Sequence, residues 1–295
     1  MSAELLINVT PSESRVALIE NGILQEIHVE RHTKRGLVGN IYRGKVSRVL
    51  PGMQAAFVDI GLEKAAFLHA SDIVIHNEIA EEVSASHIQK QDIRELVRDG
   101  QDIVVQVVKD PIGTKGARLT TDITIPSRYL VFMPSVTHVG VSQRIEEEAE
   151  RERLKSLVQE FCDENGGFIL RTAAEGVGKN ELQSDAAFLR RLWDKIQSRM
   201  KKRKSNVLYE DLPLARRVLR DFVGTELDRI RIDSKLSFNE LHQFTKEYVP
   251  EMNGKLEYYP GDRPIFDLYD VENEAQRALE RRVDLKSGGY LIIDQ

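Results

Sequence analysis

The chain has 295 residues, of which 41% are hydrophobic and 30% are charged, and its formal net charge is −5 at pH 7. This composition is typical of a globular protein of about two or three domains, and it excludes a polycation that binds nucleic acid along its whole length. The single cysteine, Cys162, excludes a disulfide framework and a cysteine-built zinc site within one chain. No membrane span or signal peptide is apparent, so the sequence predicts a cytoplasmic protein.

Residues 1–30 alternate apolar and polar side chains, with turn signals at residues 11–13 and 20–22. This pattern predicts a three-strand meander. Three short strands bury too little surface to be stable alone, so we expect them to complete a sheet with strands from later in the chain.

Five short strand-like runs follow, separated by Gly, Pro or Asp turns. They occupy residues 40–50, 52–61, 64–73, 100–111 and 116–123. Five such runs predict a small closed Greek-key barrel of the OB-fold type. The polar insert at residues 76–91 is predicted to be a loop with a helical turn.

The rest of the chain mixes strands and helices. Strands are predicted at 128–134, 166–170 and 227–234, and helices at 145–164, 182–205, 212–223, 237–248 and 271–285. The last nine residues, SGGYLIIDQ, are predicted to form a turn and a buried strand that lacks a partner, as expected where a further domain begins.

Phe57 and Phe67 are the first candidates for function. Each shares one strand face with a polar residue, Asp59 or His69, while the opposite face is wholly apolar. Either the rings belong to the core, or they form a platform on which nucleic-acid bases stack. The pattern favours the platform, because the core face already has its own residues. Nearby cations that can neutralise phosphate are Arg43, Lys45, Arg48, Lys109 and Lys115.

The stretch GGFILRTAAEGVGK supplies a second candidate site. Arg171 and Thr172 end an apolar strand and enter a glycine-containing turn. A guanidinium fork and a hydroxyl suit a phosphate, although a structural salt bridge to a glutamate is the competing interpretation for Arg171. The GVGK segment lacks the spacing of a nucleotide-binding loop.

The remaining polar clusters predict no catalytic or metal site in these residues. The basic run Ser198–Ser205 is interpreted as a solvated face, with an auxiliary RNA contact as the alternative. Asp267, Asp270 and Glu272 are typical of a solvated helix start rather than of metal ligands. Asp294 alone does not make a metal site.

Four segments together resemble the RNase E/G family of bacterial endoribonucleases: residues 40–73, RYLVFMP at 128–134, LRTAAEGVGK at 170–179 and LKSGGYLIID at 285–294. The resemblance runs along essentially the whole chain. It implies an α+β multidomain fold in which a split RNase H-like domain (1–38 and 212–284) encloses an inserted OB-fold β-barrel RNA-binding domain (39–122) and an α+β 5′-sensor domain (123–211). Residues 285–295 would begin a DNase I-like catalytic domain.

The same resemblance implies roles for eight residues. Phe57 and Phe67 match aromatics that hold single-stranded RNA, and Lys115 matches a basic partner. The other five match a pocket for an RNA 5′-monophosphate: Arg171 and Thr172 as the gripping residues, Val131 as a wall, Ser127 where some family members have glycine, and Arg144.

The implied function is a Mg-dependent endoribonuclease that senses RNA 5′-monophosphate and cleaves single-stranded RNA in rRNA maturation and mRNA decay. In the family, a metal-activated water attacks the phosphate, the metal-binding aspartates follow later in the sequence, and a cysteine pair shares zinc within a homo-oligomer. These positions lie beyond residue 295, so we expect the present residues to bind RNA without cutting it. The alternatives are a stand-alone non-catalytic RNA-binding module and a scaffold that binds proteins through its acidic helices.

Overall fold

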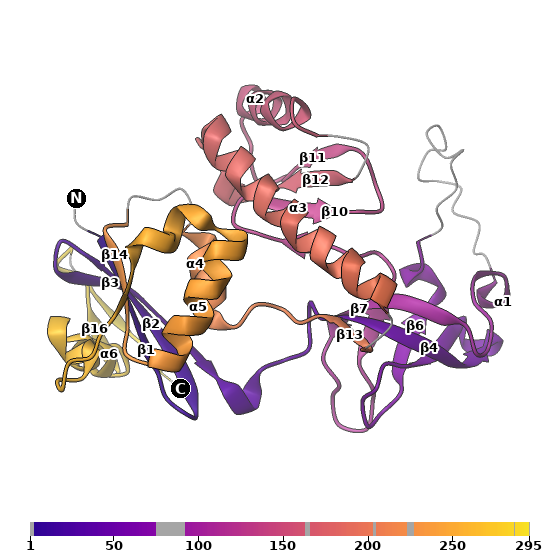
Figure 1. Ribbon diagram of the computed structural model, residues 1–295, viewed down its shortest axis with the longest axis horizontal. Helices are drawn as coiled ribbons and strands as arrows, with labels where there is room; N and C mark the ends of the chain where they lie inside the picture. The colour runs from indigo at the N-terminus through magenta and orange to yellow at the C-terminus, as the bar shows by residue number, and fades with distance from the viewer. Residues whose placement is uncertain are drawn as a thin grey trace. The chain divides into compact units, whose positions relative to one another are not determined.

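The computed structural model describes residues 3–74, 92–162, 166–202, 205–222, 227–285 and 287–294. The chain forms two compact units, Met1–Arg35 with Leu212–Gln295, and Gly36–Asp211. The first unit is therefore built from both ends of the chain, and the second from the segment between them (Figure 1). The predicted insert at residues 76–91 lies outside the described residues.

The first unit contains a five-stranded sheet in the order β15-β14-β1-β2-β3. β1 (Ala3–Val9), β2 (Glu13–Glu20) and β3 (Ile23–Arg31) form the predicted antiparallel meander. β1 also pairs in parallel with β14 (Arg229–Ile232), and β14 pairs in parallel with β15 (Leu256–Tyr258). The expectation that later strands complete the meander is confirmed.

Helices cover both faces of this sheet. α4 (Leu214–Asp221) and α5 (Lys235–Tyr248) contact one face, as Figure 1 shows. On the other face, Leu6 of β1 packs with the 3-10 helix η6 (Ile265–Tyr269) and with Val271 at the start of α6 (Val271–Ala278). Because β1 is covered on both sides, its central residues Leu5, Leu6 and Ile7 are all apolar, and the predicted alternation holds only at the two ends of the strand.

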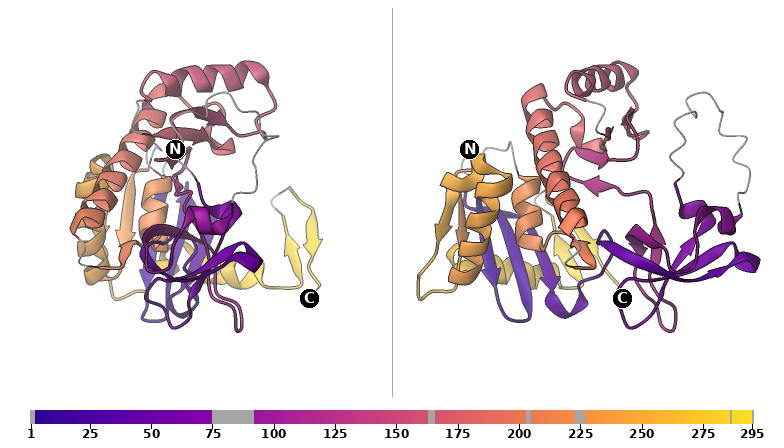
Figure 2. Two further views of the ribbon diagram at one scale, coloured as in Figure 1. Left: turned by 90° about the vertical axis from the view of Figure 1, so that its right-hand side faces the viewer. Right: turned by 45° about the vertical axis from the view of Figure 1, so that its right-hand side comes forward.

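The C-terminal segment differs from the prediction in two ways. α6 ends at Ala278, and β16 (Arg282–Asp284) then pairs with β17 (Tyr290–Ile292) in an antiparallel hairpin. β17 therefore has a partner, but it is not buried: its three residues and Ile293 each expose between 50% and 56% of their surface. The two strands form a separate two-stranded sheet, drawn in yellow in Figure 2. The prediction of a buried, unpaired strand was wrong, because an apolar run shows strand propensity but not what packs against it.

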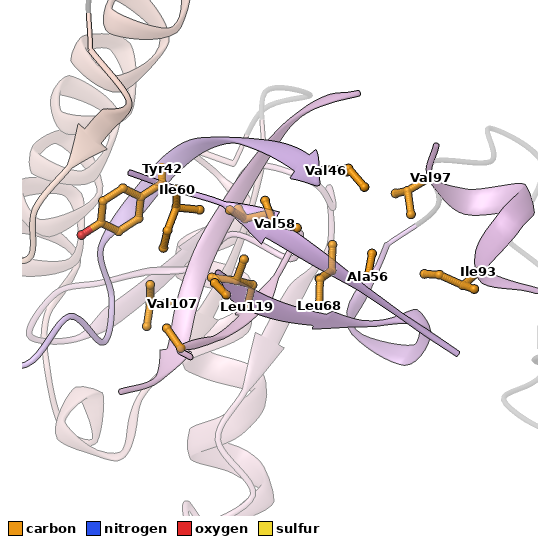
Figure 3. Close-up of a cluster of buried hydrophobic side chains, with 13 residues drawn as sticks. Tyr42, Val46, Ala56, Val58, Ile60, Leu68, Ile93, Val97, Val107 and Leu119 are labelled. Atoms are coloured by element: carbon orange, nitrogen blue, oxygen red, sulfur yellow. The ribbon is translucent and has the colours of Figure 1, made fainter. Parts of the chain in front are cut away.

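The second unit begins with the predicted barrel. Its strands are β4 (Ile41–Leu50), β5 (Ala55–Asp59), β6 (Ala66–His69), β7 (Asp102–Lys109) and β8 (Arg118–Thr120). They pair in the order β4-β5-β6-β8-β7, and pairing of β4 with β7 closes the barrel. Figure 3 shows Ala56, Val58 and Leu68 among the buried side chains of the barrel core, and Ile93 of the short helix α1 (Ile93–Leu96) joins them.

An α+β layer follows the barrel. Its sheet has the order β11-β12-β10-β9, with strands β9 (Ile125–Pro126), β10 (Leu130–Met133), β11 (Val139–Val141) and β12 (Gly167–Leu170). Its helices are α2 (Glu148–Gln159) and α3 (Lys179–Lys202). Phe132 and Phe168 face α3, where Phe132 lies 6.1 Å from the Trp193 ring. β13 (Val207–Tyr209) then returns to pair with β4.

Candidate RNA-binding surfaces

Phe57 and Phe67 lie side by side on the outer face of the barrel. They are direct cross-strand partners on β5 and β6, and their ring centroids are 6.2 Å apart in an edge-to-face arrangement. Both rings are half-buried, whereas their neighbours Ala56 and Leu68 are fully buried. The two strands therefore send their small and aliphatic side chains into the core and leave the phenylalanines at the surface, as the alternation indicated.

The strand register places cations on both sides of this aromatic pair. Arg48 of β4 is the partner of Phe57, Arg118 of β8 is the partner of Phe67, and Lys109 of β7 is the partner of Arg118. Paired residues project from the same face of a sheet, so one row of five side chains crosses five strands. We call this row, Arg48-Phe57-Phe67-Arg118-Lys109, the barrel row. A β-bulge lies next to each of its two ends.

The cations of the barrel row differ in how they are held. Arg48 and Lys109 are exposed, and their side chains form no hydrogen bond or ion pair with another described residue. Arg118 donates to both carboxylate oxygens of Asp72, at 2.9 and 3.2 Å, while 43% of its side chain remains exposed. The hydrogen bonds that Arg118 donates to Asp72, together with the charge of that carboxylate, raise the pKa of Arg118 and outweigh the opposite effect of burial. Sequence spacing alone gave no sign of Arg118, because β6 and β8 pair in parallel across a long connection.

Lys115 stands in a tight turn beside the aromatic strands. Ile112 and Lys115 exchange backbone hydrogen bonds of 3.2 and 3.0 Å, and the Lys115 side chain is exposed. The next residue, Gly116, packs directly on the residue before β6: a Cβ at this position would lie 2.0 Å from the carbonyl oxygen of Ala65. Glycine is therefore required here, and the close approach holds Lys115 next to the strand that carries Phe67.

One of the predicted phosphate-neutralising cations also joins two parts of the second unit. The guanidinium of Arg43 donates to the carbonyl oxygen of Met200 at the end of α3, and its backbone N–H donates to the carbonyl oxygen of Asn206 at 2.7 Å. Arg43 thus connects the barrel to the α+β layer, and its phosphate-neutralising role stays a prediction. Lys45 remains exposed on β4, opposite Asp59.

In the α+β layer, Arg171 follows β12 and is exposed. Its backbone N–H donates to the carbonyl oxygen of Tyr129 at 2.8 Å. Its Nη1 donates to the carbonyl oxygen of Ser127 and, at 3.4 Å, to that of Arg128. Among the described residues no acidic side chain pairs with Arg171, so the salt bridge that competed with the phosphate interpretation is not found there.

Thr172 meets a serine that the sequence interpretation missed. Thr172 begins the 3-10 helix η4 (Thr172–Ala174) and is exposed. Its hydroxyl lies 3.4 Å from the Ser142 hydroxyl, which also accepts from the Arg144 backbone N–H at 3.4 Å. Ser142 directly follows β11, which pairs in parallel with β12, and this pairing brings the two chain segments together. The predicted residues Arg144 and Thr172 are thus joined through Ser142.

Val131 and Ser127 have different positions. Val131 is half-buried on the sheet face opposite the helices, where its cross-strand partner is Ile169. The Ser127 side chain is fully buried, and its hydroxyl donates to Asp185 at 2.5 Å and to the carbonyl of Leu130 at 3.1 Å. The Ser127 side chain therefore does not face solvent, and this residue reaches Arg171 only through its backbone carbonyl. Only the backbone of Ser127 is left for the phosphate pocket, and its place in that pocket stays a prediction.

Glu150 of α2 ties down the turn that follows the Arg171–Thr172 pair. Its carboxylate accepts from Arg153 at 2.6 and 2.8 Å and from the backbone N–H of Gly176 at 2.8 Å. The hydrogen bonds from Arg153 and from Gly176, in that order, lower the pKa of Glu150 to about 2. The carboxylate stays ionised at neutral pH and fixes the loop to the helix.

The basic run at the end of α3 has a structural role in part. Arg199 donates to the carbonyl oxygen of Leu208 at 3.0 Å, and Arg199 and Lys202 line a cavity of about 390 Å³ together with Glu210. Cations in the last turn of a helix complement its dipole. No described helix has the length and apolar character that a membrane crossing requires.

The described residues do not fit a magnesium or zinc site. They contain no group of three or more His, Cys, Asp or Glu side chains arranged to hold a metal ion. The exposed carboxylate of Asp294 accepts from Arg281 at 2.7 Å, and that of Glu272 pairs with Arg15 at 2.8 Å. Asp270 precedes α6 and Glu272 lies in its first turn, where the sequence predicted a solvated helix start.

A closed barrel with a half-buried aromatic pair on its outer face, between cations, is typical of RNA-binding proteins of the OB type, and comparisons with known proteins agree. Residues 37–118 match the model of the S1 RNA binding domain, and residues 124–295, more than half of the chain, match that of the Ribonuclease E/G family. The predicted OB barrel is confirmed. The chain belongs to the ribonuclease E/G family.

Several curated proteins are similar to the whole chain. Ribonuclease G of Escherichia coli (strain K12) is 69% identical over 296 residues, and ribonuclease G of Haemophilus influenzae is 63% identical over 295 residues. Both alignments cover 100% of this chain but 60% of the relative, so the chain spans 60% of the length of these relatives. Ribonuclease E of H. influenzae is 35% identical over 297 residues, which cover 98% of this chain and 31% of that protein.

Proposed function

We propose that this chain is the RNA-recognising part of an endoribonuclease similar to ribonuclease G, and that it holds single-stranded RNA on the barrel while it reads the 5′-monophosphate in the α+β layer. The observation that carries the proposal is the barrel row, in which two surface phenylalanines lie between cations on a confirmed S1-type barrel.

The barrel row suits unpaired RNA for a physical reason. A base stacked on Phe57 or Phe67 gains about 1–3 kcal/mol whatever its identity, because every base has a π-face. Arg48 and Lys109 lie beyond the rings at the two ends of the row, where the phosphates on either side of the stacked bases would pass. In a duplex the bases are stacked on one another and cannot reach the rings, so the surface favours single strands.

The second site suits a terminal phosphate. The Arg171 guanidinium uses Nη1 for two backbone carbonyls, and this leaves Nε and Nη2 as a fork for two phosphate oxygens. The hydroxyl of Thr172, with Ser142 beside it, supplies a further donor. Val131 forms a wall, and the exposed Arg144 adds charge. A 5′-hydroxyl end lacks the dianion that these groups recognise.

The remaining assignments rest on family membership and the relatives' names. We propose a cytoplasmic, Mg-dependent hydrolase of rRNA precursors and mRNA that forms a homo-oligomer with shared zinc, both metal sites lying outside these residues. The meander joined in parallel to β14 and β15 supports an RNase H-like domain split into 1–38 and 212–284. The barrel at 39–122, the sensor at 123–211 and the start of a DNase I-like domain at 285–295 complete the proposed division.

Binding of two single-stranded RNAs that differ only at the 5′ end tests the sensing site. The chain is titrated into a fluorescent A/U-rich RNA that carries either a 5′-monophosphate or a 5′-hydroxyl. A hydrogen bond to a charged group contributes about 1.5–3 kcal/mol, so Arg171→Ala should reduce the preference for the monophosphate roughly ten- to a hundredfold. Arg94→Ala is the matched control, because Arg94 is an exposed arginine paired with Asp92 on α1. Equal losses for both RNAs would show that Arg171 has only a structural role.

The second candidate function, a non-catalytic RNA-binding module, is favoured by the lack of a metal-binding cluster among the described residues. A cleavage assay separates the two. We expect these 295 residues to bind the monophosphorylated RNA but not to cut it with Mg²⁺ present, whereas a protein of the relatives' full length should cut it. Cleavage by the 295 residues that disappears in Asp294→Ala or Asp267→Ala would overturn this assignment.

A further inference from the structure

The α+β layer contains a buried carboxylate to which no role has been given. Asp185 lies on α3 and is only 3% exposed. One of its oxygens, Oδ2, accepts three hydrogen bonds: from the Ser127 hydroxyl at 2.5 Å and from the backbone N–H groups of Tyr129 and Leu130 at 3.0 and 2.9 Å. Burying a carboxylate is costly unless it is well satisfied, so such a group marks a position where it holds other parts in place.

The three donors all belong to one four-residue turn, residues 127–130, between β9 and β10. The turn is closed by the Ser127 backbone N–H, which donates to the Leu130 carbonyl at 2.8 Å. Asp185 thus fixes both ends of the turn from the neighbouring helix. Two backbone N–H groups and one hydroxyl of the turn are therefore held by one buried anion.

The same turn holds Arg171. The carbonyl groups of Ser127 and Arg128 point to its Nη1, and the carbonyl of Tyr129 accepts its backbone N–H at 2.8 Å. Three donors of the turn, the Ser127 hydroxyl and the N–H groups of Tyr129 and Leu130, are therefore used on Asp185. Three carbonyls of the turn, those of residues 127, 128 and 129, are used on Arg171. The chain of contacts runs from α3 through the turn to the guanidinium.

We propose that Asp185 is a positioning residue for recognition of the RNA 5′-phosphate: it fixes the 127–130 turn, whose carbonyls set the direction of the Arg171 fork. This inference rests on the proposed function of Arg171. A pre-oriented guanidinium loses less side-chain freedom when it binds, so phosphate discrimination depends on a residue that never touches the phosphate.

Two graded variants test the inference. Asp185→Asn keeps one oxygen for the three donors but removes the charge, and Ser127→Ala removes one donor and leaves the carboxylate. Because a positioning residue contributes less than the group it positions, each variant should lower the preference for 5′-monophosphorylated over 5′-hydroxyl RNA by roughly two- to thirtyfold, less than Arg171→Ala does. Affinity for the 5′-hydroxyl RNA should stay within about twofold. Asp194→Ala, an exposed aspartate on the same helix, is the control and should leave the preference unchanged.

A double-mutant cycle decides whether Asp185 acts through Arg171. In the Arg171→Ala background, Asp185→Asn should cause no further loss of preference, because there is no guanidinium left to orient. If the losses add, or if Asp185→Asn weakens both RNAs equally, the positioning role is overturned. If Arg171→Ala alone leaves the preference intact, the proposed sensing function fails, which is a separate result. Thermal unfolding of each variant identifies any loss that comes from misfolding, and Ser127→Ala carries the test if Asp185→Asn does not fold.

Discussion

Replacing Phe67 by alanine separates a binding platform from a core residue. Leu68 is its neighbour on β6 and points the other way, into the barrel, with no exposed surface. Leu68→Ala should cost about 2–5 kcal/mol of unfolding free energy, as expected for a fully buried leucine. Phe67 is half-buried and loses its edge-to-face contact with Phe57, 6.2 Å between centroids, which is worth about 0.5–1.5 kcal/mol. We therefore expect Phe67→Ala to destabilise the protein by about 1–2 kcal/mol.

The RNA affinity should respond in the opposite order. Loss of one stacking ring costs about 1–3 kcal/mol, so Phe67→Ala should weaken binding of an unstructured RNA roughly five- to 150-fold. Leu68→Ala should leave the affinity of the folded fraction nearly unchanged. Both variants are measured by urea unfolding and by fluorescence anisotropy under one buffer. A loss of 3–5 kcal/mol in stability for Phe67→Ala, the cost of a core aromatic, together with unchanged affinity would refute the platform.

Two further predictions follow from charges. Arg48→Ala should reduce the slope of log affinity against log salt by about 0.7 for a single strand, because one phosphate contact is lost; an unchanged slope would place Arg48 outside the RNA path. Burial works to raise the pKa of Glu4, but hydrogen bonds from Arg229 at 2.6 Å and Tyr269 at 2.9 Å outweigh it and lower this pKa below 4.5. The ionised Glu4 therefore stabilises the fold above pH 4.5, and this contribution is lost as the pH falls through the lowered pKa. Glu4→Gln should lower the unfolding free energy by about 1–3 kcal/mol at neutral pH and make it less dependent on pH in acid. An equal loss at pH 3 and pH 7 would contradict this.

Much of this protein is set by local sequence pattern. The alternation in residues 1–30 determines the meander, and five short runs between turn residues determine the barrel strands. The same period of two separates Phe57 and Phe67 from the core, because the pleat sends adjacent side chains to opposite faces. The Arg171–Thr172 pair is visible as a polar end to an apolar strand. Each single strand or motif named here is recognised from about ten consecutive residues.

Tertiary structure determined the burial and the hydrogen-bond partners of side chains whose neighbours are distant in the sequence. The parallel pairing of β6 with β8 places Arg118 beside Phe67, and a carboxylate on α3 takes the Ser127 side chain out of the predicted pocket. The end of α3 supplies a carbonyl for the guanidinium of Arg43, a contact that the sequence did not indicate. The apolar residues of β17 remain exposed because β16 pairs with only one edge of the strand and covers neither of its faces. Strand propensity is a property of a segment, whereas burial and hydrogen-bond partners are properties of what the fold brings against it.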